Sequence, residues 1–191
     1  MNDDASLLLD DKSKGCDAAF HFLSAFRYCP VCGGARFAVS GVRSKRCADC
    51  GFEFFCNASA AVAAFIVDGE GRLLVCRRAK NPAQGTLDLP GGFVDPDESM
   101  EDAMARELEE ELGCRPVTIR YLFSGHNRYE YSGVVVPTAD SFFLCTLPAE
   151  AVLRPQDDVA AYDWVPLAAV RPSDFGLHSI AEGVARFLRM V

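Results

Sequence analysis

The chain has 191 residues, half of them hydrophobic and 24% charged, which allows one good hydrophobic core and a small satellite domain. No apolar run approaches the ~18 residues of a membrane-spanning helix, and a formal net charge of -8 argues against broad electrostatic binding to nucleic acid. Because residues 1–4 lack the positive start of a secretory signal, we expect a cytoplasmic protein.

The N-terminal part of the chain is predicted to hold a structural metal site. Residues 1–25 should form a loose start and a short helix. Two Cys-x2-Cys pairs follow, and a glycine comes directly after each: Cys29 with Cys32, and Cys47 with Cys50. This spacing is typical of a zinc ribbon, in which a hairpin brings four thiolates into a closed tetrahedron around Zn²⁺. We therefore predict an N-terminal segment, a zinc ribbon and a main domain, over residues 1–25, 26–57 and 58–191.

The main domain should open with two strands. A mostly apolar run of strand length starts at Ala60, the turn 68–71 follows, and residues 72–78 form a second hydrophobic strand. Strands joined by so short a turn usually pair with each other. The sequence therefore predicts a β-hairpin here.

A short helix is predicted next, with Ser99 as its N-cap and Gly113 as its C-terminal glycine. Its apolar stripe consists of Met104, Leu108 and Leu112, which should pack into the core. Residues three and four apart share a helix face, so the stripe leaves one edge for polar side chains.

The polar edge of this helix carries Glu107, Glu110 and Glu111, beside the flexible turn 90–92. Carboxylates so close together repel one another. An acidic face alone usually indicates only solvated surface, but a hard cation such as Mg²⁺ binds to one or two carboxylates and to substrate phosphate. The spacing therefore favours a divalent-metal site.

Beyond this helix, the sequence predicts strands over 117–124 and 141–147, a loop between them, a closing strand over 163–167 and a last helix over 178–190. The loop should hold His126, Arg128 and two tyrosines. Mixed strands with one helix on each side are typical of an α/β/α sandwich with a mixed sheet.

Residues 92–114 match every fixed position of the Nudix box, G-x5-E-x7-R-E-U-x-E-E-x-G-U, where U is a bulky aliphatic residue, except that Cys114 stands at the last U. A buried cysteine behaves as a small hydrophobic residue. The chain thus resembles the Nudix hydrolase family. The resemblance implies the α/β/α sandwich fold and Mg²⁺- or Mn²⁺-dependent hydrolysis of a nucleoside diphosphate linked to another group, such as a dinucleotide, ADP-ribose or a nucleotide sugar.

Carried over position by position, the resemblance implies that Glu107, Glu110 and Glu111 bind the catalytic metal, with the Gly91 carbonyl as a further ligand. Arg106 should hold one of these glutamates in place, and Glu98 should act on the site from outside the metal ligands.

The general base is less defined by sequence. Glu107 itself, Asp158, Glu130 and Asp157 are all candidates, with Asp158 as a tentative metal ligand. Candidate substrate-binding residues are Arg77 and Arg78 at a strand end, for phosphate, together with His126 and Arg128, for a base. Each of these taken alone is also compatible with ordinary exposed surface.

A zinc ribbon ahead of a Nudix box is similar to the layout of NADH pyrophosphatases. Their Ser-Gln-Pro-Trp-Pro-Phe-type motif is missing, however, from the region after the box, residues 125–133. Two alternatives stay open: an RNA-directed Nudix protein, acting in decapping or binding RNA through the basic ribbon, and a catalytically silent nucleotide sensor. We expect a homodimer, a nucleotide-type substrate and no membrane partner.

Overall fold

The protein is described by a computed structural model, in which residues 21–154 and 159–191 are placed. The chain divides into two compact units, Met1–Cys56 and Asn57–Val191. None of the helices in the described part of the chain is long and apolar enough to cross a membrane.

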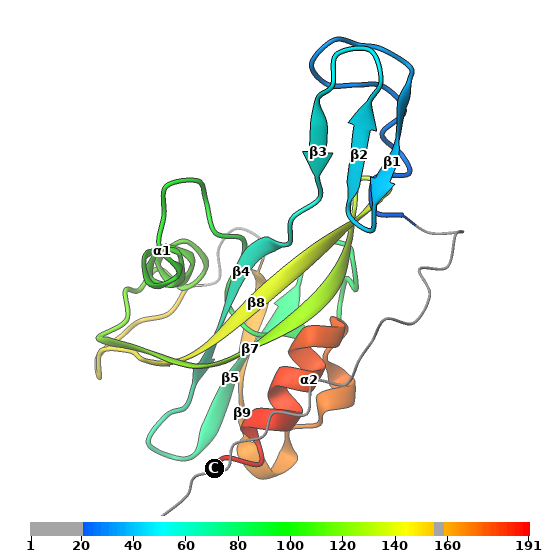
Figure 1. Ribbon diagram of the computed structural model, residues 1–191. Coiled ribbons are helices and arrows are strands. Elements are labelled where there is room, and N and C mark those ends of the chain that lie inside the picture. Colours follow the sequence, from blue (N-terminus) through cyan, green and yellow to red (C-terminus); the bar gives the residue numbers. More distant parts are fainter. Residues whose placement is uncertain (1–20, 155–158) are drawn as a thin grey trace, which may run out of the picture. The chain divides into compact units, whose positions relative to one another are not determined.

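In its described residues, the first unit contains one antiparallel sheet of three strands: β1 (Phe37–Gly41), β2 (Ser44–Cys47) and β3 (Glu53–Phe55), in that order (Figure 1). The hairpin predicted for the ribbon is therefore confirmed. The short helix predicted before the ribbon is wrong for residues 21–25, which form turns, with Ser24 N–H donating to the His21 carbonyl at 2.8 Å. The rest of that prediction, residues 1–20, lies outside the described residues.

The second unit contains two sheets of three strands. One has the order β4 (Ser59–Ile66), β8 (Val134–Thr146), β7 (Thr118–Tyr131), and it is mixed because β4 and β8 run parallel. The other is antiparallel, in the order β6 (Leu87–Asp88), β5 (Arg72–Arg78), β9 (Val159–Pro166). Short 3₁₀ turns, Leu167–Ala169 and Pro172–Asp174, follow β9.

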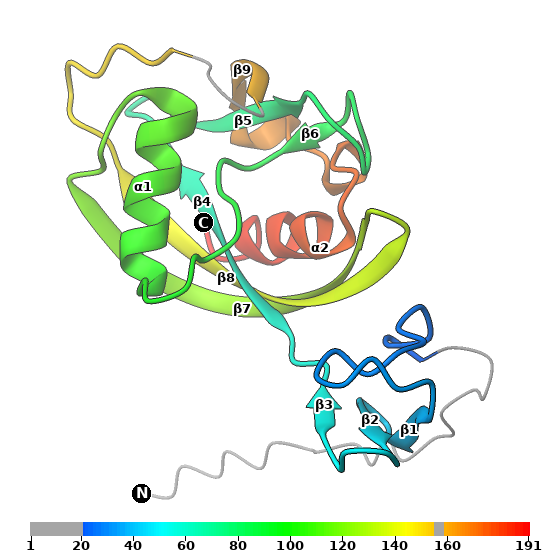
Figure 2. The same ribbon diagram turned by 90° about the horizontal axis from the view of Figure 1, so that it is seen from above.

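The two helices, α1 (Met100–Leu112) and α2 (His178–Phe187), cover opposite sides of β4 (Figure 2). Alternate residues of β4 explain this arrangement. Val62, Ala64 and Ile66 belong to the core on the α1 side, with Met104, Leu108 and Leu112. The residues between them, Ala63 and Phe65, pack with Ile180, Val184 and Phe187 of α2. A strand buried on both faces needs cover on both, so the predicted α/β/α sandwich is confirmed.

The predicted hairpin of β4 and β5 is wrong. The two strands are joined by a tight turn in which Asp68 Oδ1 accepts the N–H groups of Glu70 and Arg72, both at 2.9 Å. Beyond the turn, only one bridge, between Val67 and Leu73, connects them. The strands then diverge into different sheets, because the long strand β8 pairs with all eight residues of β4.

The loop predicted between 124 and 141 is also wrong. These residues continue β7 and β8 as one long antiparallel hairpin, which closes at Ser132 and Gly133. Both residues have positive φ angles, 50° and 78°, as in the two-residue turns that match the twist of a hairpin. The Ser-Gly pair between alternating residues was the local signal for this turn.

Candidate active site and zinc-ribbon cysteines

Helix α1 begins and ends at the residues expected from the sequence. Ser99 Oγ accepts the N–H of Asp102 at 3.1 Å, and Gly113 ends the helix with a φ of 70°. Met104, Leu108 and Leu112 are fully buried. Packing of this stripe determines the rotation of the helix about its axis, so the glutamates at its edge lie at the boundary between core and solvent.

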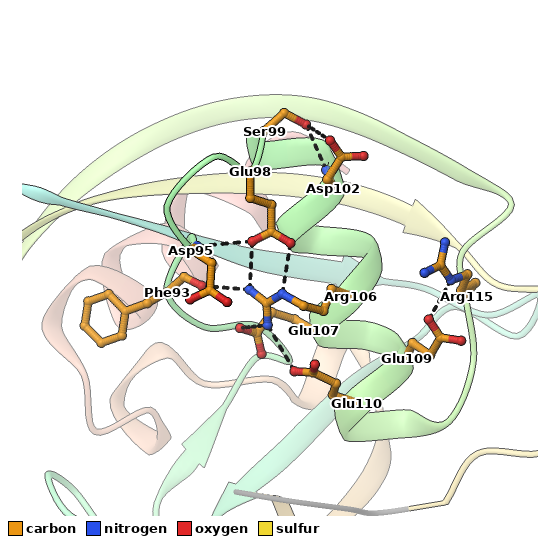
Figure 3. Close-up of polar contacts among 10 residues, drawn as sticks. All are labelled: Phe93, Asp95, Glu98, Ser99, Asp102, Arg106, Glu107, Glu109, Glu110 and Arg115. Carbon is orange, nitrogen blue, oxygen red and sulfur yellow. Dashed lines mark hydrogen bonds and ion pairs between the residues drawn. The ribbon is translucent and has the colours of Figure 1, made fainter.

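Arg106 is the centre of the carboxylate cluster (Figure 3). Its Nε and Nη2 donate to the two oxygens of Glu98, both at 2.9 Å. Its Nη1 donates to Glu107 Oε1 at 2.9 Å and to Glu110 Oε2 at 3.0 Å. One guanidinium therefore gathers three of the four predicted glutamates, while Glu109 points away and binds Arg115.

Burial and mutual hydrogen bonding shift the pKa values of two of these carboxylates and of Arg106. Hydrogen bonds from Arg106 hold the pKa of Glu98 below its ordinary value. Burial raises the pKa of Glu107, and Arg106 offsets part of that rise. The same carboxylates raise the pKa of Arg106, which keeps the guanidinium charged.

Glu111 is joined to the turn before the helix. Its side chain is buried, and Oε2 accepts the N–H of Gly91 at 2.9 Å. The carbonyls on either side of Gly91, those of Pro90 and Gly92, accept N–H groups of β4, and this pairing leaves out the Gly91 carbonyl. The turn thus lies between β4 and the glutamates of α1.

The two glycines of this turn have different neighbours. A Cβ on Gly91, where φ is 145°, would lie 2.1 Å from the Val62 carbonyl oxygen. A Cβ on Gly92 would lie 2.5 Å from Glu107 Oε1. Glycine is therefore required at position 91 because a side chain would collide with the backbone of β4. At position 92, a side chain would instead displace the Glu107 carboxylate.

We expect Gly92→Ala to weaken Mn²⁺ binding by about tenfold, because the added methyl displaces Glu107. The fold should persist, since only the end of a flexible side chain must move. Titration of Mn²⁺ by calorimetry, beside a thermal melt, measures both effects. Gly69→Ala, at a site where no atom lies within 4 Å of the added Cβ, is the control. Equal Mn²⁺ affinity in all three proteins would contradict this role of Gly92.

A pocket of about 380 Å³ lies beside the glutamates, a volume within the usual range for small-molecule sites. Its lining includes five residues of the predicted site: Gly91, Arg106, Glu107, Glu110 and Glu111. Glu98 does not line it, but it binds two residues that do, the Arg106 side chain and the Asp95 backbone N–H. The structure thus brings together the residues predicted for the metal and places Glu98 behind them.

The predicted phosphate-binding arginines both line the pocket. Arg77 Nη1 donates to the Gly85 carbonyl at 2.7 Å. Arg78 forms an ion pair with Asp88, and it also donates to the Pro82 carbonyl and to the Tyr129 hydroxyl, at 2.7 and 3.3 Å. Arg78 is therefore held in the wall of the pocket by internal contacts, whereas Arg77 lies at its exposed edge.

His126 and Arg128 are not brought to the pocket. They belong to the exposed face of β7, and the alternation of a strand turns Asn127 and Tyr129 inward instead. Glu130 is exposed on the same outer face. Asp157 and Asp158, the other candidates for the base, lie outside the described residues.

Sequence reasoning missed several polar residues of the pocket: Asp88, Asn127, Thr138 and Asp140, together with Lys80. A signal existed for Asp88, which stands three positions before Gly91 in a segment otherwise apolar. The three on β7 and β8 could be found only by recognising that these are long, paired strands.

The four predicted zinc ligands also come together. The Sγ atoms of Cys29, Cys32, Cys47 and Cys50 lie within 4.8 Å of one another. Within the described residues, no other group of three or more His, Cys, Asp or Glu side chains brings its ligand atoms this close together. Two of the sulfur pairs, Cys29 with Cys50 and Cys32 with Cys47, are 3.7 Å apart. A tetrahedral zinc with Zn–S bonds of about 2.3 Å separates its sulfurs by about 3.8 Å, so the cluster fits that ion.

The closeness of the four thiols changes their ionisation. Burial opposes ionisation of Cys29, yet the backbone N–H groups of Cys32 and Val31 lower its pKa to about 7, whereas contacts with the other sulfurs raise the pKa of Cys32 to about 12. Thiolates are the form that binds metal. The first unit thus has the arrangement of a zinc ribbon.

Comparison with known proteins identifies the second unit. A family model described as the NUDIX domain matches residues 58–188. The chain belongs to the NUDIX family. Among solved structures, a NUDIX hydrolase from Nitrosomonas europaea superposes with a TM-score of 0.64 at 20% identity, covering 85% of this chain and 90% of that one. This likeness supports the Nudix fold.

Two curated relatives of this NUDIX chain are similar in sequence. The NAD-capped RNA hydrolase NudC of Deinococcus radiodurans is 28% identical over 121 residues, which are 62% of this chain and 43% of the relative. The ADP-ribose pyrophosphatase of Methanocaldococcus jannaschii is 41% identical over 51 residues, 27% of this chain and 30% of the relative. The chain therefore spans less than half the length of these relatives.

Proposed function

We propose that this NUDIX chain is a metal-dependent pyrophosphohydrolase. Its substrate would be a nucleoside diphosphate linked to another group, as in a dinucleotide, ADP-ribose or a nucleotide sugar. The observation that carries the proposal is that Glu107, Glu110 and Glu111 all line one pocket of suitable volume. Both relatives named above act, by name, on compounds of this type.

The glutamates would hold Mg²⁺ or Mn²⁺, with the Gly91 carbonyl as a further oxygen ligand. Such an ion neutralises charge on phosphate oxygens and makes bound water more acidic. Hard cations prefer oxygen ligands, and the donor set here is entirely oxygen. Glu107 and Glu110 would exchange their contacts with Arg106 Nη1 for the ion, while Glu98 keeps the guanidinium in place through Nε and Nη2.

In the reaction, the oxygen of a water molecule bonds to phosphorus and the bridging P–O bond breaks. Two phosphate monoesters result and take up the protons of the water. Arg77, at the exposed edge of the pocket, would bind a phosphate oxygen. Glu107 is the described candidate for the base, because its carboxylate lies in the pocket where the water would be held.

The zinc ribbon would hold Zn²⁺ through four cysteines. With four thiolates, the ion has no open position for a substrate, so its role would be structural. The support for this is the fit of the sulfur separations to a tetrahedral site.

The activity can be tested by release of nucleoside monophosphate from NAD, NADH, ADP-ribose, nucleotide sugars and dinucleoside polyphosphates. The protein is assayed with Mg²⁺ or Mn²⁺ and with EDTA. We expect at least one substrate to be cleaved in an EDTA-sensitive reaction. Binding of these nucleotides without cleavage would favour the sensor alternative and contradict the proposal.

The surface of the ribbon favours a second candidate, an RNA-directed function. Phe26, Tyr28 and Phe55 are exposed there, and the Arg43 guanidinium lies 5.5 Å from the Phe55 ring centre. Exposed aromatic rings beside arginines suit the stacking of single-stranded bases. The NudC relative is named for an RNA substrate. Lack of RNA binding at low salt, where phosphate contacts are strongest, would remove this candidate.

A further inference from the structure

One wall of the pocket carries three buried polar side chains outside the glutamate cluster. Asp140 is 6% exposed, Thr138 is 4% exposed and Asn127 is 8% exposed, and all three line the pocket. Thr138 and Asp140 are two residues apart on β8, and so share a face. Asn127 lies directly opposite Thr138 on β7.

Two of these side chains have polar atoms that the protein does not satisfy. Asp140 Oδ1 and Thr138 Oγ1 are buried and have no hydrogen-bond partner within the described residues. Asn127 Oδ1 accepts the N–H of Arg128 at 2.9 Å, which leaves its amide nitrogen as the donor. Buried polar groups are nearly always paired, so atoms of this kind in a pocket indicate a ligand.

The neighbours of Asp140 explain why it has no partner. Its pair on β4 is Ala61 and its pair on β7 is Gly125, and neither side chain can donate a hydrogen bond. Arg78 donates to Asp88, Pro82 and Tyr129 instead. The other carboxyl group on this side of the pocket, Asp88, is taken up by Arg78 and by the N–H of Leu89 and has no hydrogen to donate to Asp140 in its charged form.

This wall is separate from the metal ligands. Asp140 and Phe142 are two residues apart on β8, so their side chains point to the same face of the sheet. Phe142 packs in the core on the α2 side, which places Asp140 on that side as well. Leu177 and Ile180, at the start of α2, also line the pocket. The glutamates come from α1, on the other side of β4. One end of the pocket thus has the ligands for metal and phosphate, while the other has apolar surface and directed hydrogen-bonding groups.

We propose that Asp140 accepts a hydrogen bond from the amino group of a nucleobase, and that Asn127 donates to the adjacent ring nitrogen. Adenine and cytosine both present this donor-acceptor edge. Hypoxanthine and uracil have a carbonyl oxygen in place of the amino group, which would face the acceptor Asp140 and be rejected. Thr138, between the two, completes the polar wall. This specificity rests on the pyrophosphohydrolase proposed above.

The test compares substrates that differ only in this group: NAD with nicotinamide hypoxanthine dinucleotide, and CDP-glucose with UDP-glucose. With Mn²⁺, we expect the wild-type kcat/KM to favour the amino compound of a cleaved pair by at least about tenfold. Asp140→Asn should reduce this ratio to about one or reverse it, because the new amide can donate to a carbonyl oxygen.

Ser141→Ala is the matched control, since Ser141 is the next residue of β8 and its hydroxyl contacts Met100 on the opposite face. It should keep the wild-type ratio. The same preference is measured without turnover by calorimetric binding of AMP and IMP. An AMP preference that Asp140→Asn abolishes would support the inference even if no substrate is cleaved, which would overturn only the proposed hydrolysis.

Three results would overturn the inference. One is equal binding and turnover of amino and carbonyl compounds by the wild type. Another is an unchanged ratio in Asp140→Asn. The third is a fall in melting temperature of more than about 5 °C in Asp140→Asn, because it would show that the carboxylate serves the fold.

Discussion

Replacing Glu111 with glutamine should lower metal-dependent hydrolysis by at least about 10²-fold while leaving the fold intact. Glutamine keeps the length of the side chain and an oxygen that can accept the Gly91 N–H, now bonded at 2.9 Å. It loses the negative charge that a cation requires. Initial rates with Mn²⁺, Mn²⁺ titration and a thermal melt would separate loss of the metal from loss of structure.

Glu109→Gln is the control for this substitution. Glu109 belongs to the same helix, but its carboxylate binds Arg115 and does not line the pocket. We expect wild-type rates and Mn²⁺ affinity in this variant. If Glu111→Gln also keeps the wild-type rate, Glu111 has no part in the mechanism and the metal site must be assigned to other ligands.

Loss of the ribbon metal should unfold the first unit. Among the described residues of this unit, the buried hydrophobic cluster consists of Cys29, Phe37 and Cys47, with Phe52 packed against it, and Leu23 is also buried. So small a core cannot offset the conformational entropy of the chain, whereas zinc binding to such sites supplies about 10–16 kcal/mol. We therefore expect Cys32→Ser to lose zinc and the hydrogen-exchange protection of residues 36–56.

The second unit should keep its own protection in that variant, because its two core clusters contain no residue of the first unit. Zinc content by mass spectrometry and hydrogen exchange on the full chain are the measurements. Cys114→Ser, a cysteine outside the cluster, should retain one zinc per chain. A Cys32→Ser protein that still binds zinc and protects the ribbon would refute the proposed ligand set.

Local signals were sufficient where a feature depends on nearby residues. Ser99 and Gly113 cap α1 through hydrogen bonds that reach only three to five residues along the chain. The Cys-x2-Cys pairs could also be predicted from the sequence, since each tight turn positions its own two sulfur atoms. The glutamates of α1 could be assigned to one edge because helical spacing alone determines which residues share a face.

Strand pairing was harder to predict because its partners are distant in sequence. The short turn at 68–71 indicated that β4 and β5 pair, yet β4 pairs with β8, more than seventy residues later. The strand β7 was predicted to end at Ser124, since its outer half is polar. That half is in fact paired to β8 as far as Tyr131, where the Ser-Gly turn closes the hairpin.

The sequence by itself determined the family resemblance, the glutamates proposed to bind metal, the cysteine cluster and the two-helix sandwich, because each depends on local spacing or on a simple apolar pattern. Only the tertiary structure decided which side chains face the pocket. Pairing of β7 with β8 turned Asn127 inward and His126 outward, and placed Asp140 between Ala61 and Gly125. The physical reason is that successive residues of a strand point to opposite faces, so an error about where a strand runs changes every side chain assigned to the site.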